Sequence, residues 1–271
     1  MAAIPPLVLV DGQPESRVSA LDRGLSYGDG VFRTVAIVAG KPRWWPDHLI
    51  KLGHDGARLN LACPPAADWD LDLAKLGPLP ASGVLRLTVT RGVGPRGYPP
   101  TPGLPGTRIL ACWAAELPHY PVSGLNLRVC DLRAASQPAL AGIKHLNRLE
   151  NVLARAEWAD PDIHEGVMLD QDGLVVGGVM SNLFLWRDQR LVTPRLDRCG
   201  VAGLTRQRLL ERARAAGLPV EEGDFGLTAL LEAEEVFLSN SLMGLCRAHR
   251  LGNHVWPEDS VLPRLTALLH A

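Results

Sequence analysis

The sequence predicts two α/β domains whose sheets are mixed or mostly antiparallel. Its 271 residues suffice for one large domain or two modest ones. Strand and helix patterns follow one another without the regular alternation that a parallel, doubly wound sheet requires. A stretch rich in turn residues, 117–124, reads as a linker. We therefore expect an N-terminal domain at residues 1–116 and a C-terminal domain at residues 125–271.

The first half shows strand signals closed by turn residues. Asp11-Gly12 ends the first apolar run, and a turn also follows the second. Asp47 is a candidate N-cap for a helix with apolar residues at helical spacing. Residues 92–106 are rich in Gly and Pro, which predicts a long loop, and such loops are often functional. The predicted strands are residues 7–10, 31–38, 84–90 and 107–114.

The second half is predicted to hold three helices and several short strands. A helix at 205–216 ends at Gly217 and Pro219, which stop helices. The other two helices are expected at 148–158 and 261–269. The predicted strands are residues 125–130, 166–169, 174–176, 183–186, 191–193 and 235–239.

Charge and composition exclude several classes of partner. The chain has 28 basic and 29 acidic residues, so no net charge favours binding to nucleic acid or to an anionic membrane. No apolar run reaches the ~18 residues of a membrane span, and the N-terminus lacks the basic start of a secretory signal. The five cysteines are scattered without metal-ligand spacing. We expect a cytoplasmic protein that binds a small molecule and no metal.

Lysine is rare in this chain, and one lysine lies in an unusual place. Only four of the 28 basic residues are lysines, and Lys144 follows five uncharged residues. Partial burial lowers the pKa of a lysine amine, and a neutral amine attacks carbonyl groups to form Schiff bases. Lys144 is therefore a candidate catalytic residue. The alternative is a structural lysine whose stem packs on apolar neighbours.

The segment from Gly200 to Arg206 has the composition of a phosphate site. Two glycines and Thr205 precede or open a predicted helix, where free N–H groups and the helix dipole favour an anion. The turn at 239–244 could add hydroxyl donors. The alternative is an ordinary capped helix, and the sequence alone leaves both open.

Arg91 and Arg96 lie on the Gly-rich loop that follows the third predicted strand. Arginine binds carboxylates through two parallel hydrogen bonds, so this loop is a candidate site for a carboxylate substrate. The alternative is a flexible surface loop.

Seven segments together resemble the fold type IV pyridoxal-phosphate enzymes, which include D-amino-acid and branched-chain aminotransferases and aminodeoxychorismate lyases. They occur in the family's order: DRGLSYGDGVF, HLIKLGHDGARL, RGVGPRGY, GIKHLNRLENVLAR, SNLFLW, TPRLDRCGVAGLTRQ and EVFLSNSLMG. RGVGPRGY and GIKHLNRLE are similar to the lyases in particular. The resemblance implies a two-domain fold like that of D-amino-acid aminotransferase, and an enzyme that forms 4-aminobenzoate and pyruvate for folate synthesis.

The resemblance also implies roles for single residues. Lys144 matches the lysine that binds pyridoxal 5'-phosphate as a Schiff base and then acts as general base. Leu204 and Thr205 match the phosphate donors at a helix start, and Ser241 a further hydroxyl donor. Lys51 stands where the family usually has Arg, so it would meet the phosphate as a point charge.

The same resemblance places Arg91, Arg96 and Tyr98 near the substrate carboxylates. This loop could serve a neighbouring subunit, because the family forms homodimers.

One position departs from the family pattern. The family has a Glu-Gly-x-x-Ser-Asn segment whose Glu pairs with the pyridine nitrogen, and here Gly177 replaces that Glu. The acid makes the ring a better electron acceptor, so its loss weakens stabilisation of a carbanion. Two alternatives to the lyase therefore stand: an aminotransferase for D- or branched-chain amino acids, and a protein that keeps the cofactor but has impaired catalysis.

Overall fold

The computed structural model describes residues 6–121, 123–257 and 261–271. The chain forms two compact units, which are described separately. The first unit comprises the chain up to Pro118 together with Ile143–Asn147. The second comprises His119–Gly142 and the chain from Arg148 onward. Residue 122 of the predicted linker lies outside the described residues.

The first unit is built on a five-stranded sheet in the order β1-β5-β4-β2-β3, and all its strand pairs are antiparallel. The predicted strands are confirmed, and a short hairpin strand, β3, is added. Residues pair in continuous register from Gly30 opposite Thr90 to Val38 opposite Ser82. The strands are β1 (Leu7–Val10), β2 (Gly30–Val38), β3 (Lys41–Pro42), β4 (Ser82–Thr90) and β5 (Arg108–Ala114).

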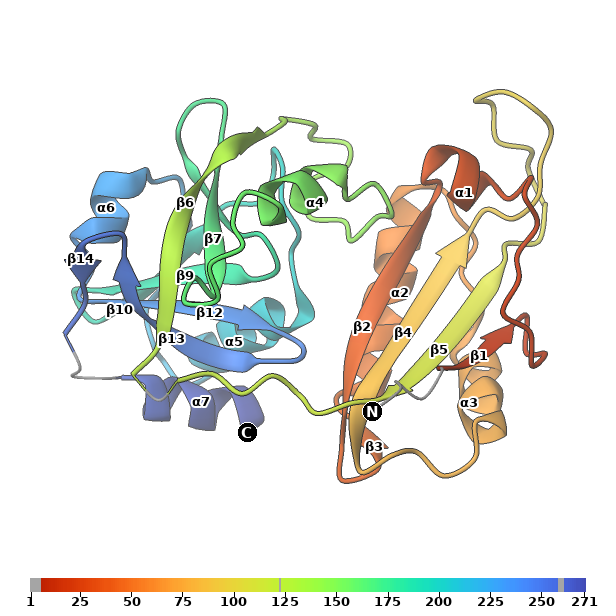
Figure 1. Cartoon of the computed structure of the whole chain (residues 1–271), viewed down its shortest axis with the longest axis horizontal. Coiled ribbons are helices and arrows are strands. Elements are labelled where there is room, and N and C mark those ends of the chain that lie inside the picture. Colours follow the sequence, from red (N-terminus) through yellow and green to blue (C-terminus); the bar gives the residue numbers. More distant parts are fainter. Residues whose placement is uncertain (1–5, 122, 258–260) are drawn as a thin grey trace. The chain divides into compact units, whose positions relative to one another are not determined.

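Two helices, α2 (Trp45–Arg58) and α3 (Ala66–Lys75), lie on one face of this sheet (Figure 1). They share a core with the strands, in which Trp69 is 1% and Leu52 1% exposed. The prediction that Asp47 caps α2 is wrong. Pro46 fits the first turn of a helix, so α2 begins at Trp45 and Asp47 lies inside that turn.

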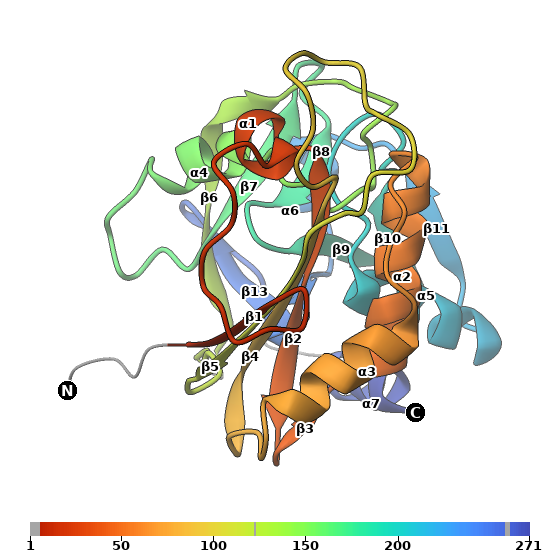
Figure 2. The same ribbon diagram turned by 90° about the vertical axis from the view of Figure 1, so that its right-hand side faces the viewer.

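A third helix of the first unit, α1 (Arg23–Tyr27), was not predicted because five residues carry no periodic signal. Asp22 caps it by accepting from the Gly24 amide at 2.7 Å. The predicted loop, residues 92–106, extends beyond the end of the sheet beside α1 (Figure 2). α1 is therefore placed to hold this loop.

Residues 143–147 join the first unit as a short extension of its sheet. The Phe32 amide donates to the Lys144 carbonyl at 3.0 Å, and the Leu146 amide donates to the Gly30 carbonyl at 3.0 Å. Val31 and His145 form an antiparallel bridge between these two hydrogen bonds. This pairing fixes the backbone that carries Lys144 against the start of β2.

The second unit contains a mixed sheet in the order β11-β10-β9-β12-β13-β6-β7-β8, with β14 paired to β13. Parallel pairs join β10 to β11, β13 to β6 and β6 to β7, and the other pairs are antiparallel. The sequence thus predicted the mixed character of the sheet, but not β11, β13 or β14. The strands are β6 (Leu125–Ala134), β7 (Glu165–Asp170), β8 (Val175–Gly178), β9 (Asn182–Arg187), β10 (Arg190–Pro194), β11 (Val220–Gly223), β12 (Glu235–Asn240), β13 (Gly244–Leu251) and β14 (His254–Val255).

Four helices complete the second unit, and two of them, α5 and α7, pack together beside β12 and β13 (Figure 1). The predicted helices are confirmed with slightly different ends, whereas the short α6 was not predicted. No helix in the described part of the chain has the length and apolar character needed to span a bilayer. The helices are α4 (Leu149–Arg155), α5 (Leu204–Ala215), α6 (Leu227–Leu231) and α7 (Leu262–His270).

Candidate functional site

The backbone of Lys144 is held by hydrogen bonds at both its amide and its carbonyl. Its carbonyl accepts from β2, as described above, and its amide donates to the Asp55 carboxylate at 2.9 Å. The side chain is half-buried, and its Nζ lies 4.7 Å from the centre of the Phe32 ring. The structure therefore places the lysine that the sequence singled out in a fixed and partly desolvated position.

A buried charge cluster surrounds Asp55 on α2. The Lys51 Nζ lies 2.8 Å from Asp55 Oδ1, and the Arg33 guanidinium donates to Oδ2. Burial lowers the pKa of Lys51, Asp55 opposes that change, and Arg33 adds to it. This cluster holds two cations for one carboxylate, which suits a site that receives an anion.

His48 lies in the same region and is neutral at physiological pH. Burial, together with the positive charges of Arg33 and Lys144, lowers its pKa to about 3. Its imidazole is 1% exposed. His48 therefore adds no positive charge to the region around Lys144.

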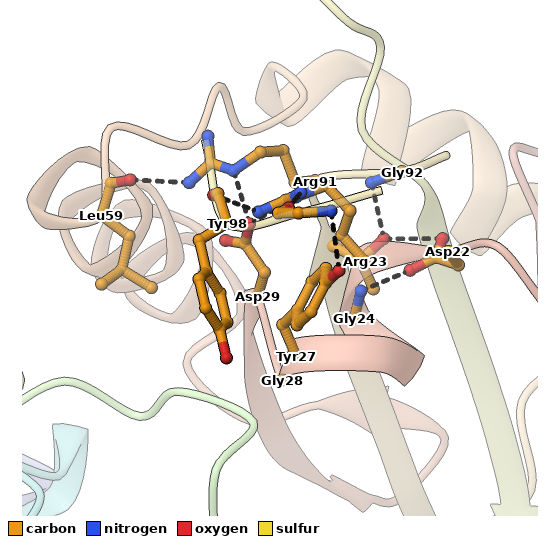
Figure 3. Close-up of polar contacts among 12 residues, drawn as sticks. Asp22, Arg23, Gly24, Tyr27, Gly28, Asp29, Leu59, Arg91, Gly92 and Tyr98 are labelled. Carbon is orange, nitrogen blue, oxygen red and sulfur yellow. Dashed lines mark hydrogen bonds and ion pairs between the residues drawn. The ribbon is translucent and has the colours of Figure 1, made fainter. Parts of the chain in front are cut away.

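The loop residues Arg91 and Tyr98 belong to one network around Asp29 (Figure 3). Arg91 donates to Asp29 at 2.8 Å and to the carbonyl of Leu59 at 2.8 Å, at the end of α2. Arg23 also donates to Asp29, at 3.0 Å, and its other nitrogens hold the carbonyls of Gly97 and Tyr98 at 2.8 Å. Burial raises the pKa of the Asp29 carboxyl, but its hydrogen bonds and ion pairs with Arg91 and Arg23 outweigh burial, so the pKa is lowered.

The predicted substrate residues on the loop thus differ in their surroundings. The guanidinium of Arg91 is directed to Asp29 and to the end of α2, so it fixes the base of the loop. Arg96 is exposed, and the Tyr98 side chain is among the most exposed apolar groups at 84%. Tyr98 rests against Tyr27 with ring centres 5.6 Å apart. Whether Arg91, Arg96 and Tyr98 contact substrate stays a prediction.

The N-terminus of α5 has the features of an anion site. Its N-cap is Gly203, no side chain caps it, and its first turn contains no acid. The Thr205 hydroxyl is buried and has no hydrogen-bond partner among the described residues. A buried hydroxyl without a partner and uncapped N–H groups fit the phosphate of a cofactor. Leu204 opens the helix, and Ser241 is half-buried in the turn after β12.

Asn182 shapes the turn before α5. Its Oδ1 accepts from the Gly203 amide at 3.0 Å, and its Nδ2 donates to the Val201 carbonyl at 2.7 Å. A Cβ at Gly203 would lie 2.4 Å from Asn182 Oδ1, so the turn requires glycine there. Ser239 is paired opposite Asn182 between β12 and β9, and its buried hydroxyl also has no partner among the described residues.

Gly177 has a positive φ angle, which residues with side chains rarely adopt. The buried acid Glu165 lies beside Gly178, on the other face of the strand. The φ of Gly177 is +155°, and a Cβ there would lie 3.0 Å from the Ser181 carbonyl. A Cβ at Gly178 would instead lie 2.9 Å from the Glu165 carboxylate. Because successive side chains of a strand point to opposite faces, Glu165 does not occupy the place of the acid that Gly177 lacks.

Glu165 stabilises the turn that leads into β9. Its carboxylate accepts from the Ser181 hydroxyl at 2.8 Å and from the Met180 amide at 3.2 Å. Burial raises the pKa of Glu165, although these hydrogen bonds favour the ionised form. Sequence reasoning missed Glu165 because its partners lie in the turn between β8 and β9, 15 and 16 positions further along the chain. It also missed Asp55, although the spacing of four from Lys51 was a visible signal.

Comparison with known proteins identifies the family. The family model of amino-transferase class IV matches residues 30–251. The chain belongs to the class IV aminotransferase family. This class IV chain is 45% identical to a crystal structure of 4-amino-4-deoxychorismate lyase from Pseudomonas aeruginosa, with a TM-score of 0.89, covering 97% of this chain and 98% of the other.

Two curated relatives show the range of activities around this class IV chain. It is 37% identical over 242 residues to an aminodeoxychorismate lyase of Vibrio harveyi, covering 87% of this chain and 88% of that protein. It is 30% identical over 266 residues to a D-alanine aminotransferase of Listeria monocytogenes, covering 94% and 89%. The predicted family and fold are therefore confirmed.

Glu165 predicts how stability depends on pH. Because its folded-state pKa is raised above the ordinary 4.5, the folded protein holds more protons than the unfolded chain above that pH. The contribution of Glu165 to the free energy of unfolding is therefore most favourable below pH 4.5 and falls as pH rises through the folded-state pKa. Urea unfolding of Glu165→Gln from pH 4 to 8 should lack this fall.

The exposed Glu232 offers a matched control, and Glu232→Gln should keep the wild-type dependence. The comparison uses the slope against pH, because Gln also removes one acceptor and shifts absolute stability. Parallel curves for the wild type and Glu165→Gln would contradict the assignment.

Proposed function

We propose that this chain is a pyridoxal-phosphate-dependent lyase that converts 4-amino-4-deoxychorismate into 4-aminobenzoate and pyruvate. The observation that carries the proposal is Lys144, whose peptide unit is fixed by β2 and Asp55 while its amine lies half-buried. Relatives with this activity at 37% and 45% identity support the same assignment.

Each unit, taken by itself, has residues that suit one part of the cofactor. The uncapped start of α5 would hold the phosphate through the amides of Leu204 and Thr205 and the Thr205 hydroxyl, with Ser241 as a further donor. Lys51 would add a positive charge, and Lys144 would provide the amine. When bound, pyridoxal phosphate supplies an aldehyde that bonds to amines and a ring that accepts electrons from the neighbouring carbon.

The chain itself links the lysine to the turn before α5. The Gly142 amide donates to the Gly200 carbonyl at 3.0 Å, and the Ala202 amide donates to the Gly142 carbonyl at 3.0 Å. Lys144 follows Gly142 by two residues.

Lys144 would act as the general base. Its side chain is half-buried, and partial removal from water favours the neutral form of an amine. A neutral amine removes a proton from the carbon that bears the substrate nitrogen. Arg96 and Tyr98, exposed on their loop, remain candidates for orienting a substrate carboxylate.

Gly177 favours the lyase over the aminotransferase. Elimination of pyruvate makes the product ring aromatic, so the reaction needs less stabilisation of a carbanion than transamination does. The D-alanine aminotransferase relative favours transamination as the second candidate. A chain that binds the cofactor with little turnover is the third candidate, and it is favoured by Gly177 in place of the acid and by Lys51 in place of the usual Arg.

We also propose that the protein is a homodimer, as the family resemblance implies. α4 carries an apolar stripe of Leu149, Val152 and Leu153, exposed by 75%, 59% and 59%, and Met180 in the same unit is 52% exposed. These positions lie on one face of a helix, because residues three and four apart are neighbours. A second copy of the chain would bury this stripe. The assignment to the cytoplasm stays a prediction.

Replacing Lys144 tests the assignment of the active amine. Lys144→Ala should lose the absorbance band that the bound cofactor gives near the edge of the visible range. It should also lower turnover by about 10²–10⁴-fold, which is what a positioned acid–base group contributes. Release of pyruvate from aminodeoxychorismate, with no keto acid added, measures turnover. Lys75→Ala, at an exposed lysine, is the control and should behave as wild type. Undiminished turnover by Lys144→Ala, without added amine, would contradict the proposal.

Restoring the acid at position 177 tests the role of the missing carboxylate. Gly177→Glu should raise transamination of alanine by a larger factor than it raises lyase turnover, because transamination depends more on the ring as an electron acceptor. Gly177→Gln causes the same backbone adjustment without the charge and serves as the control. A larger gain in the lyase reaction would show that the argument is wrong.

Oligomeric state tests the apolar stripe on α4. Sedimentation velocity of the wild type should give twice the chain mass of 29.3 kDa, and Leu149→Lys should shift the protein toward a single chain. Leu71→Lys, at a leucine on α3 that is 62% exposed, should remain dimeric. A wild-type protein that sediments as one chain at micromolar concentration would refute the dimer.

A further inference from the structure

Asp55 is a buried carboxylate that binds three donors from three segments of the chain. Its Oδ2 accepts from the Lys144 amide at 2.9 Å and from the Arg33 guanidinium, and its Oδ1 accepts from Lys51 Nζ at 2.8 Å. Asp55 is 2% exposed. Asp55 lies within the segment HLIKLGHDGARL, in which the family resemblance gives it no role.

The Lys144 amide needs an acceptor that the sheet does not provide. The segment of Lys144 pairs with β2 through the Lys144 carbonyl and the Leu146 amide, and Asp55 on α2 accepts from the amide of Lys144. A backbone N–H that is removed from water must be paired, and a carboxylate is a stronger acceptor than a carbonyl. Asp55 therefore completes the fixation of this peptide unit.

The same carboxylate sets the charge around the amine. The Asp55 carboxylate that accepts from the Lys144 amide also binds the cations Arg33 and Lys51. The Arg86 guanidinium lies 4.1 Å from the centre of the Phe32 ring, which Lys144 Nζ also approaches, at 4.7 Å. Without Asp55, Arg33 and Lys51 would lie close together with no counter-charge. Such a change would disfavour a positive charge on any neighbouring amine.

We propose that Asp55 is the positioning residue of Lys144: its carboxylate fixes the Lys144 backbone amide and balances Arg33 and Lys51 beside the amine. The proposal rests on the proposed function only for the chemical role of Lys144. Asp55 acts through Lys144 and needs no contact with cofactor or substrate.

Hydrogen exchange of the apoprotein tests the fixation of the backbone. In Asp55→Ala the Lys144 amide should exchange faster than in the wild type by about tenfold or more, because a charged hydrogen bond is lost. Asp72→Asn is the matched control: Asp72 is 1% exposed and accepts from Arg108 at 2.6 Å, so its loss destabilises the first unit without touching Lys144. Equal protection of the Lys144 amide in folded Asp55→Ala would overturn the proposal.

Lysine labelling of the apoprotein tests the balance of charge. With formaldehyde and cyanoborohydride at a series of pH values, peptide mass spectrometry follows each lysine separately. The exposed Lys41 and Lys75 serve as internal references. Asp55→Asn keeps an oxygen acceptor but loses the charge, so the labelling midpoint of Lys144 should fall by about one pH unit. An unchanged midpoint would refute the charge role.

The double variant Arg33→Met with Asp55→Asn guards against a failure to fold, because it removes both members of the buried ion pair. It should restore the Lys144 midpoint toward the wild-type value, since one cation and one anion are lost together. A midpoint as low as that of Asp55→Asn alone would contradict the balance of charge.

Activity then separates this proposal from the proposed function. Loaded Asp55→Ala should lose about 100-fold in kcat/KM, as misplacement of a catalytic group does, while Asp72→Asn keeps wild-type activity. If the wild type fails to turn over aminodeoxychorismate, the proposed function fails, and the exchange and labelling results still decide the role of Asp55.

Discussion

Two hydrogen bonds fix the backbone of Lys144 on both sides of its Cα atom, and the candidate site depends on them. One joins the Lys144 carbonyl to the Phe32 amide of β2, and the other joins the Lys144 amide to Asp55 of α2. Both partners belong to the first unit, although Lys144 follows His119–Gly142 of the second unit in the sequence. The short segment 143–147 therefore carries a residue of the later chain onto the earlier sheet. A fixed backbone would leave the nucleophilic amine proposed at Lys144 less ordering to undergo when it reacts.

The second unit contributes a complementary feature, a helix start prepared for an anion. Asn182 holds the turn through Val201 and Gly203, and glycine at 203 lets the amide side chain approach. The turn leaves the Thr205 hydroxyl buried without a partner in the described structure, a cost that the phosphate proposed to bind here would remove. The cations beside Asp55 and the helix start beside Asn182 thus each favour an anionic group.

Local patterns predicted most of the elements, and non-local contacts explain what they did not predict. The strands β2 and β4 and the helix α5 follow from runs of apolar residues and from stop signals at their ends. The role of Asp55 depends on an amide 89 positions away, which no local pattern can show. The sequence also identified Gly177 as the departure from the family, but only the pairing of β7 with β8 shows that Glu165 lies on the opposite face.

The most direct test is the site of covalent attachment. The purified protein is loaded with pyridoxal phosphate, reduced with borohydride, digested and examined by mass spectrometry. The chain has four lysines, and the account predicts that the reduced cofactor is attached to Lys144 alone. Attachment to Lys51 or to the exposed Lys41 and Lys75, with Lys144 unmodified, would contradict it.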